Sequence, residues 1–424
     1  MRLCLYNPHA VLFAPGVYHR VFRKPFQAKY GWMLGYVRSG RYDTALVVDG
    51  TASSFPLQYV VKWRWVFKVV SFFEIYIWCA LCGLNPFRQT IIFTPGRLDP
   101  RRDVLFGMGF IASALEFHDP DATILACYPG PKLLQFSHYF TKTRYLAAQI
   151  GAAGVHAFVA EADVAQSPFF KEFFPYAERV YVLPFVLRKR YVRTTAFETR
   201  INKCLAIGTT HHLEINDYTR DYCEFFKSDN YHRMRRVLYK QKEHLGALMD
   251  INIYPWEDKP LPSSRFYHAW KIYQYVYKLF HREQASYWDF DIVALYNKYA
   301  MFVSPEEDVG LPTINFIEGM ACGCAFIGLD HAMYRSLGMQ DGIHYIAYDG
   351  TLDDLCSKIS HYVNHPAELS AIADQGHAFV TRCFDEAHVR ETFWSDMEKY
   401  AASGGLVSSF VHGGKDAAPP RREA

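Results

Sequence analysis

The stretch MFVSPEEDVGLPTINFIEGMACGCAFIG, residues 301–328, contains the clearest pattern of secondary structure in the chain. Its apolar start, residues 301–303, is typical of the end of a buried strand, and the polar residues 304–308 form the loop that leaves it. A Gly-Leu-Pro turn follows, and Thr313 is then placed to cap a helix. That helix should end just before Gly323, since helices favour glycine beyond their last turn. A second apolar strand comes at once, so we predict a strand, a helix and a parallel strand.

Apolar runs alternate with helical patterns along the whole 424 residues. Continuous apolar strands separated by helices are typical of parallel sheets that are covered on both faces. The pattern restarts after the basic connector LRKRYVRTTAFETRINK, so we predict an α/β fold of two Rossmann-like doubly wound units. The predicted strands are 3–6, 45–48, 90–93, 123–127, 157–160, 180–183, 204–207, 250–254, 300–303, 325–327 and 345–347.

The composition indicates two packed cores and an uneven charge. Half of the residues are hydrophobic and 17% are aromatic, which argues against disorder. Residues 1–203 hold 25 Lys and Arg against 13 Asp and Glu, whereas the remainder holds 21 against 30. A basic first half favours an anionic partner, either nucleic acid or an anionic membrane surface. Ten scattered cysteines and the absence of a cleavable-signal pattern lead us to expect a cytoplasmic protein with reduced thiols.

One segment departs from the pattern of a soluble α/β protein. It covers residues 60–87, VVKWRWVFKVVSFFEIYIWCALCGLNPF. From 69 to 84 its only charge is Glu74, and this run is shorter than the roughly 18 to 20 residues of a membrane span. Lys62, Arg64 and Lys68 alternate with aromatic residues just before it, which suits a helix lying at the lipid headgroups. We therefore expect peripheral attachment to an anionic membrane. An ordinary buried helix and a true span remain the alternatives.

The acidic loop and the helix after it indicate which kind of ligand could bind at this edge of the sheet. Open α/β sheets bind ligands beyond the carboxyl ends of their strands, and a helix start there favours an anion such as a diphosphate. Asn315 and Glu318 are three residues apart and so share a helix face. Carboxylates beside an anion site make sense when the ligand also carries vicinal hydroxyls. A nucleotide sugar has both features. Taken singly, however, each acid of the loop can equally be a solvated surface residue.

The same stretch resembles the donor-site signature of retaining glycosyltransferases of family 4, which have the GT-B fold. In that family a second glutamate opens the motif EAMACG and holds the ribose of the donor, and here EGMACGC places Glu318 in that role. The first glutamate, which contacts the donor sugar, belongs eight positions earlier, where this chain has Gly310. The nearest acids are Glu306, Glu307 and Asp308, and the loop could deliver any one of them; Glu307 is taken as the catalytic candidate, with the choice among the three left open.

The resemblance extends over residues 150 to 400 and is weak before them. It implies a domain organisation, including a last helix that crosses back onto the first domain. The predicted parts are an acceptor-binding domain 1–195, a nucleotide-sugar-binding domain 200–385, the crossover helix 386–402 and a disordered tail 403–424. The tail is expected from its Gly, Ala, Pro and charged residues alone.

We assign the remaining candidate residues from loop positions and from this resemblance. We take the glycine of CLAIGTTHHLE to begin a loop that faces the phosphates, and we choose cations from the basic helix after it. The predicted donor-binding residues are Gly208, Thr209, Thr210, Arg235, Lys240, Asp308, Gly310, Leu311, Pro312, Thr313, Asn315 and Glu318. The predicted acceptor-binding residues are Gly16, His19, Arg20 and Arg97, and His138 joins Glu307 and Glu318 as a catalytic candidate.

No metal site is expected. The adjacent His211 and His212 cannot easily share one ion with Glu214, and the triplets 119–121 and 289–291 are explained by a turn and a helix cap. We also expect no bound cofactor, a UDP- or GDP-linked sugar as substrate, and no nucleic acid partner.

The sequence thus predicts a hexosyl transferase that moves a sugar from a nucleotide sugar to a saccharide or lipid-linked acceptor in polysaccharide or glycolipid synthesis. Catalysis should be largely electrostatic, without a metal, and the resemblance implies retention at the anomeric carbon. Two alternatives remain: a sugar-nucleotide epimerase on the same fold, and a non-catalytic module that binds a membrane surface.

Overall fold

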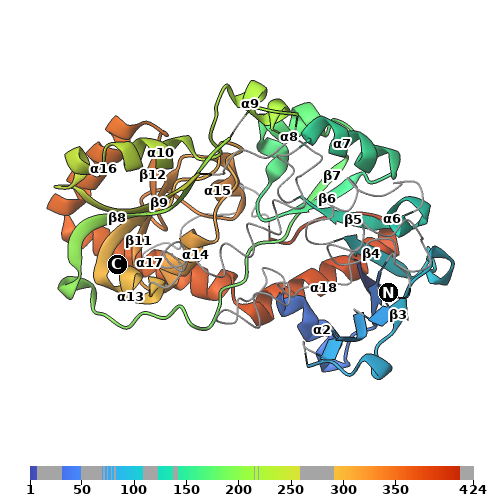
Figure 1. Cartoon of the computed structure of the whole chain (residues 1–424). Coiled ribbons are helices and arrows are strands. Elements are labelled where there is room, and N and C mark those ends of the chain that lie inside the picture. Colours follow the sequence, from blue (N-terminus) through green and yellow to red (C-terminus); the bar gives the residue numbers. More distant parts are fainter. Residues whose placement is uncertain are drawn as a thin grey trace. The chain divides into compact units, whose positions relative to one another are not determined.

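The computed structural model describes most of the chain, and its parts form two compact units. Residues Met1–Ala160, Phe170–Leu183 and Arg390–Phe410 group in the first unit, and Glu161–Phe169 with Pro184–Val389 group in the second. Figure 1 colours the chain from its N-terminus to its C-terminus. The described residues are 1–6, 31–48, 69, 72–73, 75–77, 79–80, 83–107, 123–136, 142–213, 215–217, 219–257 and 291–410.

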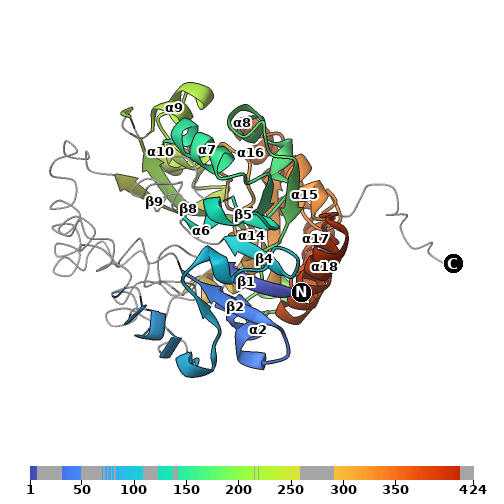
Figure 2. The ribbon, with the colours of Figure 1, turned by 90° about the vertical axis from the view of Figure 1, so that its right-hand side faces the viewer.

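The first unit is built on a seven-stranded sheet in the order β3-β2-β1-β4-β5-β6-β7, and its neighbouring strands are parallel. Figure 2 shows β1, β2 and β4 side by side in this sheet. The strands are β1 (Arg2–Tyr6), β2 (Thr44–Val47), β3 (Ile91–Ile92), β4 (Asp103–Gly107), β5 (Lys132–Gln135), β6 (Ala157–Ala160) and β7 (Arg179–Val182). The helices in the same part of the sequence are α2 (Leu34–Ser39), α6 (Ile124–Cys127), α7 (Thr143–Ala152) and α8 (Pro168–Phe173).

The second unit is built on a five-stranded parallel sheet in the order β12-β11-β10-β8-β9. Its strands are β8 (Ile201–His212), β9 (Met249–Glu257), β10 (Tyr299–Val303), β11 (Ala325–Leu329) and β12 (Ile346–Tyr348). Its helices are α9 (Arg220–Phe226), α10 (Arg233–Lys240), α11 (Lys242–Leu245), α13 (Ile292–Lys298), α14 (Asn315–Ala321), α15 (Ala332–Ser336), α16 (Leu352–Asn364) and α17 (Pro366–Cys383). The last helix, α18 (Glu386–Ser403), begins among residues of the second unit and continues among those of the first.

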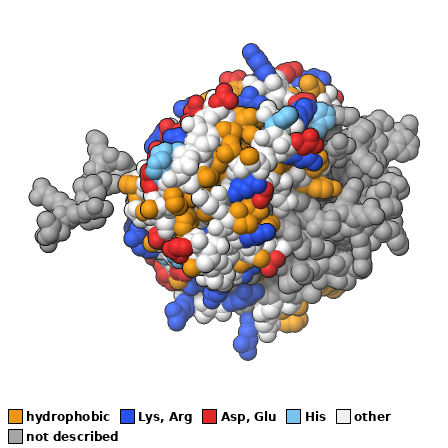
Figure 3. All heavy atoms as spheres, turned by 90° about the vertical axis from the view of Figure 1, so that its left-hand side faces the viewer, with side chains coloured by type: hydrophobic (Ala, Val, Ile, Leu, Met, Phe, Trp, Pro, Cys, Tyr) orange, Lys and Arg blue, Asp and Glu red, His pale blue; other side chains and the backbone are white. Residues whose placement is uncertain are grey.

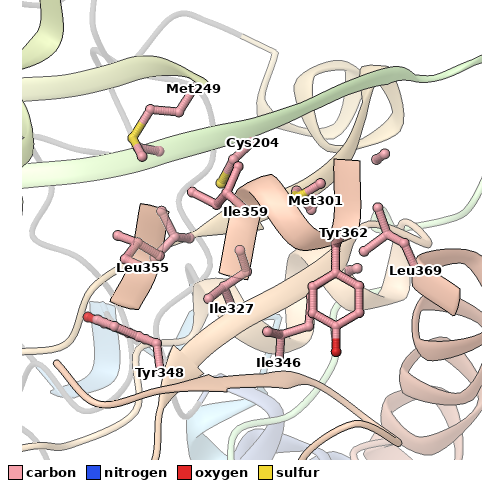
Figure 4. Close-up of a cluster of buried hydrophobic side chains, with 14 of the residues drawn as sticks. Cys204, Met249, Met301, Ile327, Ile346, Tyr348, Leu355, Ile359, Tyr362 and Leu369 are labelled. Carbon is pink, nitrogen blue, oxygen red and sulfur yellow. The ribbon is translucent and has the colours of Figure 1, made fainter. Parts of the chain in front are cut away.

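The core of the second unit shows why α16 forms where it does. Leu355, Ile359 and Tyr362 follow helical spacing and pack as one buried stripe against the sheet (Figure 4). The sheet contributes Met301 of β10 and Ile327 of β11 to the same cluster. These side chains lie on the face of the sheet, so they fix the position of β10 and with it the loop that follows β10.

The prediction of two parallel α/β units is confirmed, and most predicted strands lie within observed ones. One predicted strand, 123–127, is wrong, because these residues form helix α6, and the Thr123 hydroxyl accepts a hydrogen bond from the Ala126 N–H at 3.2 Å. An apolar run of four residues does not distinguish a strand from a helical turn. The prediction also missed β4 and β5, which are short and begin with a charged residue.

The predicted disordered tail begins too early. Residues 404–410 are described, and Phe410 is buried. The backbone N–H and hydroxyl of Ser409 both donate to the buried carboxylate of Asp396 on α18, at 2.8 and 2.6 Å. These bonds give the segment a fixed place in the first unit, whereas residues 411–424 lie outside the described part.

The surface of the chain mixes charges of both signs. On the face drawn in Figure 3, acidic and basic side chains lie interspersed among hydrophobic ones. The acidic excess of the second half of the sequence is therefore not gathered into one acidic field on this face. Among the described residues, no helix has both the length and the apolar character that crossing a bilayer requires.

Candidate active site

The strand order of the second sheet marks one place as the expected ligand crevice. β9 and β10 lie on opposite sides of β8, so the direction in which the sheet grows reverses between β8 and β10. In open parallel sheets, ligands bind outside the carboxyl ends of the strands at such a switch point. The loop of the quoted stretch leaves β10 at this edge. The topology therefore supports the edge that the sequence indicates.

β8 and β9 continue past the end of β10 as a two-stranded ribbon. β8 pairs with β9 as far as His212 and Glu257, but with β10 only as far as Ala206 and Val303 (Figure 1). The predicted glycine loop is thus wrong in its structure, because Gly208, Thr209 and Thr210 are strand residues paired with β9. Their pairing explains why no loop forms: β-branched threonines suit an extended ribbon.

Gly208 lets the side chain of Arg235 lie against the ribbon. Its φ is +140°, and a Cβ at this position would lie 2.8 Å from Arg235 Cδ and Nε. Arg235 is buried, and its Nε donates to the carbonyl of Pro305 at 2.6 Å while its Nη1 donates to the carbonyl of Thr209 at 3.3 Å. The guanidinium therefore joins β8 to the loop after β10. The direct donor contact that the sequence predicts for Arg235 stays a prediction.

Glu306 anchors the loop after β10 to the neighbouring strand. Its carboxylate accepts a hydrogen bond from the hydroxyl of Tyr334 and one from the N–H of Leu329 at 3.4 Å. Burial raises the pKa of this carboxyl above its usual range. Glu306 is thus a buried structural acid, and its surface-loop interpretation does not hold.

Asp308 and Gly310 fix the far part of the loop. The Asp308 carboxylate pairs with Arg233 Nε at 2.9 Å, and its N–H donates to the carbonyl of Tyr231 at 3.0 Å. The Gly310 N–H donates to the carbonyl of Glu307 at 2.7 Å and closes the predicted turn. Gly310 has φ +85°, a value that favours glycine.

Glu307 lies between these two anchored acids and faces a histidine. Its carboxylate is 3.8 Å from Nε2 of the buried His232, and about a fifth of its side chain is exposed. The His232 ring in turn lies 5.8 Å from that of His211 on the ribbon, measured between centroids. A partly exposed carboxylate and two imidazoles thus occupy the edge where β8 and the loop after β10 meet.

Helix α14 begins and ends close to where the sequence predicts. Its last residue is Ala321, and Gly323 has φ +76°. Thr313 does not cap it, because its hydroxyl lies 3.4 Å from that of Ser304 and its carbonyl accepts the N–H of Phe316. Asn315 Nδ2 also donates to the buried Ser304 hydroxyl, at 3.0 Å. The start of α14 is therefore tied back to the end of β10.

Glu318 is the most unusual ionisable group of the site. It is 4% exposed, and its Oε1 lies 3.9 Å from Nη1 of Arg188 in the connector before β8. Burial raises the pKa of Glu318 to about 7, and the nearby Arg188 and Tyr191 only partly oppose this rise. A surface location of this glutamate is thereby excluded. At neutral pH this carboxyl is balanced between its charged and neutral forms.

The other predicted residues divide by location. Pro312 is buried and Leu311 partly buried in the turn before α14. Lys240 is exposed at the last residue of α10, about 10 Å along the helix axis from Arg233. Arg97 lies in η3 (Pro95–Arg97), and its carbonyl accepts a bond from Arg2 at the start of β1. Lys240 and Arg97 thus lie away from the carboxyl edges of their sheets, and their predicted roles stay predictions.

Four other predicted residues lie outside the described part of the chain: Gly16, His19, Arg20 and His138. Most of the segment 60–87 also lies outside it.

Sequence reasoning missed Arg188 and His232 as members of the site. Both face acids that are distant in sequence, and the residues next to them in the sequence do not predict such a pairing. The run of four basic residues at 188–193 was visible, but only the fold brings one of them to Glu318.

Within the described residues, no group of three or more His, Cys, Asp or Glu side chains is placed to hold a metal ion. Asp291 instead caps α13, and its Oδ1 accepts the N–H groups of Val293 and Ala294, both at 3.1 Å. The helix-cap interpretation of this aspartate is confirmed.

Comparisons with known proteins agree with the sequence resemblance in part. A family model described as glycosyl transferase-like matches residues 256–394, which is less than half of the chain. A comparison with curated proteins gives no match. Among solved structures, HepE from Anabaena in complex with UDP aligns with a TM-score of 0.48 at 11% identity, covering 94% of this chain and 99% of that one.

Two further structures show a similar and a lower likeness. A glycosyltransferase from Rickettsia africae aligns with a TM-score of 0.47 at 11% identity, covering 95% of this chain and 99% of that one. The pneumococcal O-GlcNAc transferase GtfA, in complex with UDP and GlcNAc, aligns with a TM-score of 0.36 at 12% identity, covering 72% of this chain and 58% of that one.

Proposed function

We propose that the chain is a glycosyltransferase that binds a nucleotide sugar at the carboxyl edge of the second sheet. The match of residues 256–394 to a glycosyl transferase-like model supports the reaction class. The matched residues include β10, the loop after it and α14, which together line the switch point of the sheet. Reaction class and location therefore rest on separate observations.

Glu318 carries the proposal. A carboxylate this deeply buried is costly to ionise unless hydrogen-bond donors reach it. Arg188, at 3.9 Å, is beyond ordinary hydrogen-bond distance, and the hydrogen bond from Tyr191 offsets the effect of burial on the Glu318 pKa only in part. The ribose of a nucleotide has two vicinal hydroxyls, and we propose that they donate to the Glu318 carboxylate. Nucleotide binding would then favour the ionised form of this group.

Glu307 is our candidate for the acid that contacts the donor sugar. Glu306 is held by Tyr334 and Leu329, and the carboxylate of Asp308 pairs closely with Arg233. Glu307 is the most exposed of the three: about a fifth of its side chain is exposed, whereas the Asp308 side chain is 6% exposed and Glu306 is 5% exposed. We propose that Glu307, three positions upstream of Gly310, takes the part of the first glutamate of the family signature.

The chemistry would be mostly electrostatic. The bond between the anomeric carbon and the donor phosphate breaks, a bond to the acceptor oxygen forms, and a phosphate oxygen of the departing nucleoside diphosphate takes the acceptor proton. Preorganised polar groups that match charge developing in the transition state lower the barrier. We propose retention at the anomeric carbon, a hexosyl donor linked to UDP or GDP, and activity without a metal ion or cofactor.

We propose a saccharide or a lipid-linked saccharide as the acceptor, within polysaccharide or glycolipid synthesis. A lipid-linked acceptor would bring the enzyme to the cytoplasmic face of a membrane. The acceptor residues suggested by the sequence fall largely outside the described residues, so this part of the proposal rests on composition and resemblance.

The proposal is tested by release of nucleoside diphosphate from a panel of nucleotide sugars with acceptor fractions, with and without EDTA. We expect release that depends on acceptor and not on EDTA. Glu318→Ala should reduce it at least tenfold, because a buried polar contact to the donor is lost. Glu243→Ala, at an exposed position of the same unit, is the matched control and should match the wild type.

Two results would reject the proposal in different ways. Conversion of the sugar without any acceptor would indicate an epimerase. Unchanged nucleotide sugars with every acceptor, together with wild-type behaviour of Glu318→Ala, would indicate a binding module.

A further inference from the structure

An exposed apolar stripe runs along one helix of the first unit. The described positions 69, 72–73, 75–77 and 79–80 are helical. Val69, Phe72, Phe73 and Ile77 are 47, 43, 61 and 55% exposed, which is unusual for large apolar side chains standing together. The inward-facing Ile75 and Cys79 are buried. The described helical positions are thus apolar both toward the core and toward solvent.

Helical geometry places the exposed residues on one face. At about 100° per residue, positions 69, 72, 73, 76, 77 and 80 fall within an arc of about 140°. Positions 75 and 79 point elsewhere, which agrees with their burial. A soluble helix normally presents charged residues on such an outer face. None of the described helical positions here carries a charge.

The loop before β3 enlarges this surface. Phe87 in η2 (Pro86–Arg88) is 86% exposed, and its ring lies 5.6 Å from that of Tyr76. The Phe72 ring lies 4.6 Å from that of Tyr76. The stripe and the loop therefore form one continuous surface. We call it the apolar patch and define it by Val69, Phe72, Phe73, Tyr76, Ile77 and Phe87.

The charged residues that flank the apolar patch in the sequence are mostly positive. Arg88 is exposed directly beside Phe87, and the described residues 83–98 contain no Asp or Glu. In the sequence, Lys62, Arg64 and Lys68 precede the patch, although these three lie outside the described residues. Glu74 is the sole acid between residues 60 and 98. Apolar side chains beside Arg88, and preceded in the sequence by three more cations, match a bilayer of anionic lipids, which offers hydrocarbon beneath negative headgroups.

We propose that the apolar patch docks the protein onto the surface of an anionic membrane. Among the described residues no helix is long and apolar enough to cross a hydrocarbon core of about 30 Å, and the patch is proposed to lie on the membrane. A second copy of the chain fits less well. A symmetric contact places the same patch, with Arg88 beside it, opposite itself. This proposal concerns a different surface from the sugar-transfer site and does not depend on it.

The test compares co-sedimentation of the full chain with vesicles of phosphatidylcholine alone and with added phosphatidylglycerol. The wild type should bind the anionic vesicles more tightly, and salt should weaken this binding. The double variant Phe73→Ser/Ile77→Ser should bind about tenfold more weakly, because less apolar area enters the bilayer. Its melting temperature should not fall, because both side chains are exposed in the folded protein.

The matched control is Ile215→Ser/Val407→Ser, which removes two exposed apolar side chains outside the apolar patch and should bind as the wild type does. Equal binding of the two double variants to anionic vesicles would overturn the proposal. So would failure of the wild type to bind vesicles of either composition. A wild type that is dimeric in sedimentation, with a monomeric Phe73→Ser/Ile77→Ser variant, would show that a second copy covers the patch.

Discussion

At the scale of single residues, Glu318 links stability to pH in a way that can be measured. Its pKa is raised to about 7 from an ordinary value of 4.5. The folded state therefore holds the proton more tightly than the unfolded chain does. The stability associated with the protonated form is fully present below about pH 4.5 and is lost as pH rises toward 7. Glu318→Gln, which stays neutral, should remove this loss.

We expect Glu318→Gln to be more stable than the wild type at about pH 8 by at most about 3 kcal/mol, and to lose less stability between about pH 5 and pH 8. Urea unfolding at the two pH values measures this. Burial also raises the pKa of Glu306 and Asp308, but both remain in the variant, so the difference between the two proteins isolates Glu318. If the unfolding free energies of the two proteins change with pH in parallel, burial does not raise the pKa of Glu318.

Gly208 gives a second prediction at this scale. Gly208→Ala places a methyl group 2.8 Å from the Arg235 side chain in a backbone conformation that alanine disfavours. We expect a loss of about 1 to 3 kcal/mol in unfolding free energy, and weaker nucleotide binding as Arg235 shifts. The control Gly246→Ala meets its nearest atom at 3.5 Å and should behave as the wild type. Equal unfolding free energies for the two variants would contradict the close approach of Arg235.

Sequence reasoning found Glu318 because its motif is local, but it could not assign the acids of the loop. Glu306, Glu307 and Asp308 are adjacent and of like chemistry. Tyr334, His232 and Arg233 distinguish them, and these partners come from other parts of the chain. Arg235 was identified as a cation near the site, yet its role depends on carbonyls that only the fold brings close.

At the scale of elements, the loop after β10 is held by the Tyr334 hydroxyl on α15. Tyr334→Phe leaves a buried Glu306 oxygen without this donor, and we expect a loss of about 1 to 3 kcal/mol in the unfolding free energy of the second unit. Tyr362→Phe is the control, because Tyr362 belongs to the hydrophobic cluster of the same unit (Figure 4) and its variant keeps the buried ring while removing a hydroxyl. Denaturant unfolding decides between them. No difference between the two variants would remove Glu306 as the anchor.

Element types were predictable where the pattern was long and failed where it was short. The helical spacing of Leu355, Ile359 and Tyr362 makes α16 predictable from the sequence. The four residues of α6 and the short strand β5 could not be predicted in this way, because an apolar run of this length fits either a helix or a strand. The extension of β8 through Gly208 was also missed, since a glycine followed by threonines is read as a turn unless the pairing with β9 is known.

At the scale of the whole molecule, the end of the described chain belongs to the first unit. A chain that ends at Phe410 should melt as the full chain does. A chain that ends at Ser403 loses the burial of Phe410 and the Ser409 bonds to Asp396, and we expect roughly 3 kcal/mol lower stability of the first unit. Calorimetry of the two truncations tests this. Equal melting of both would mean that residues 404–410 contribute nothing to the fold.

The two-unit α/β architecture followed from the sequence because apolar strand runs and helical stripes recur on both sides of the basic connector. The strand order did not follow, since it depends on pairings between runs that look alike. That order matters most for function, because it places the switch point at β8 and β10.

The most direct test of the central claim is a thermal-shift measurement with UDP-, GDP-, ADP- and CMP-linked sugars on the wild type, Glu318→Ala and Glu243→Ala. A ligand that binds only the folded state raises the melting temperature by mass action. We predict that one nucleotide class stabilises the wild type and Glu243→Ala and leaves Glu318→Ala unshifted. The claim is contradicted if no nucleotide sugar stabilises the wild type, or if Glu318→Ala is stabilised as strongly as the wild type.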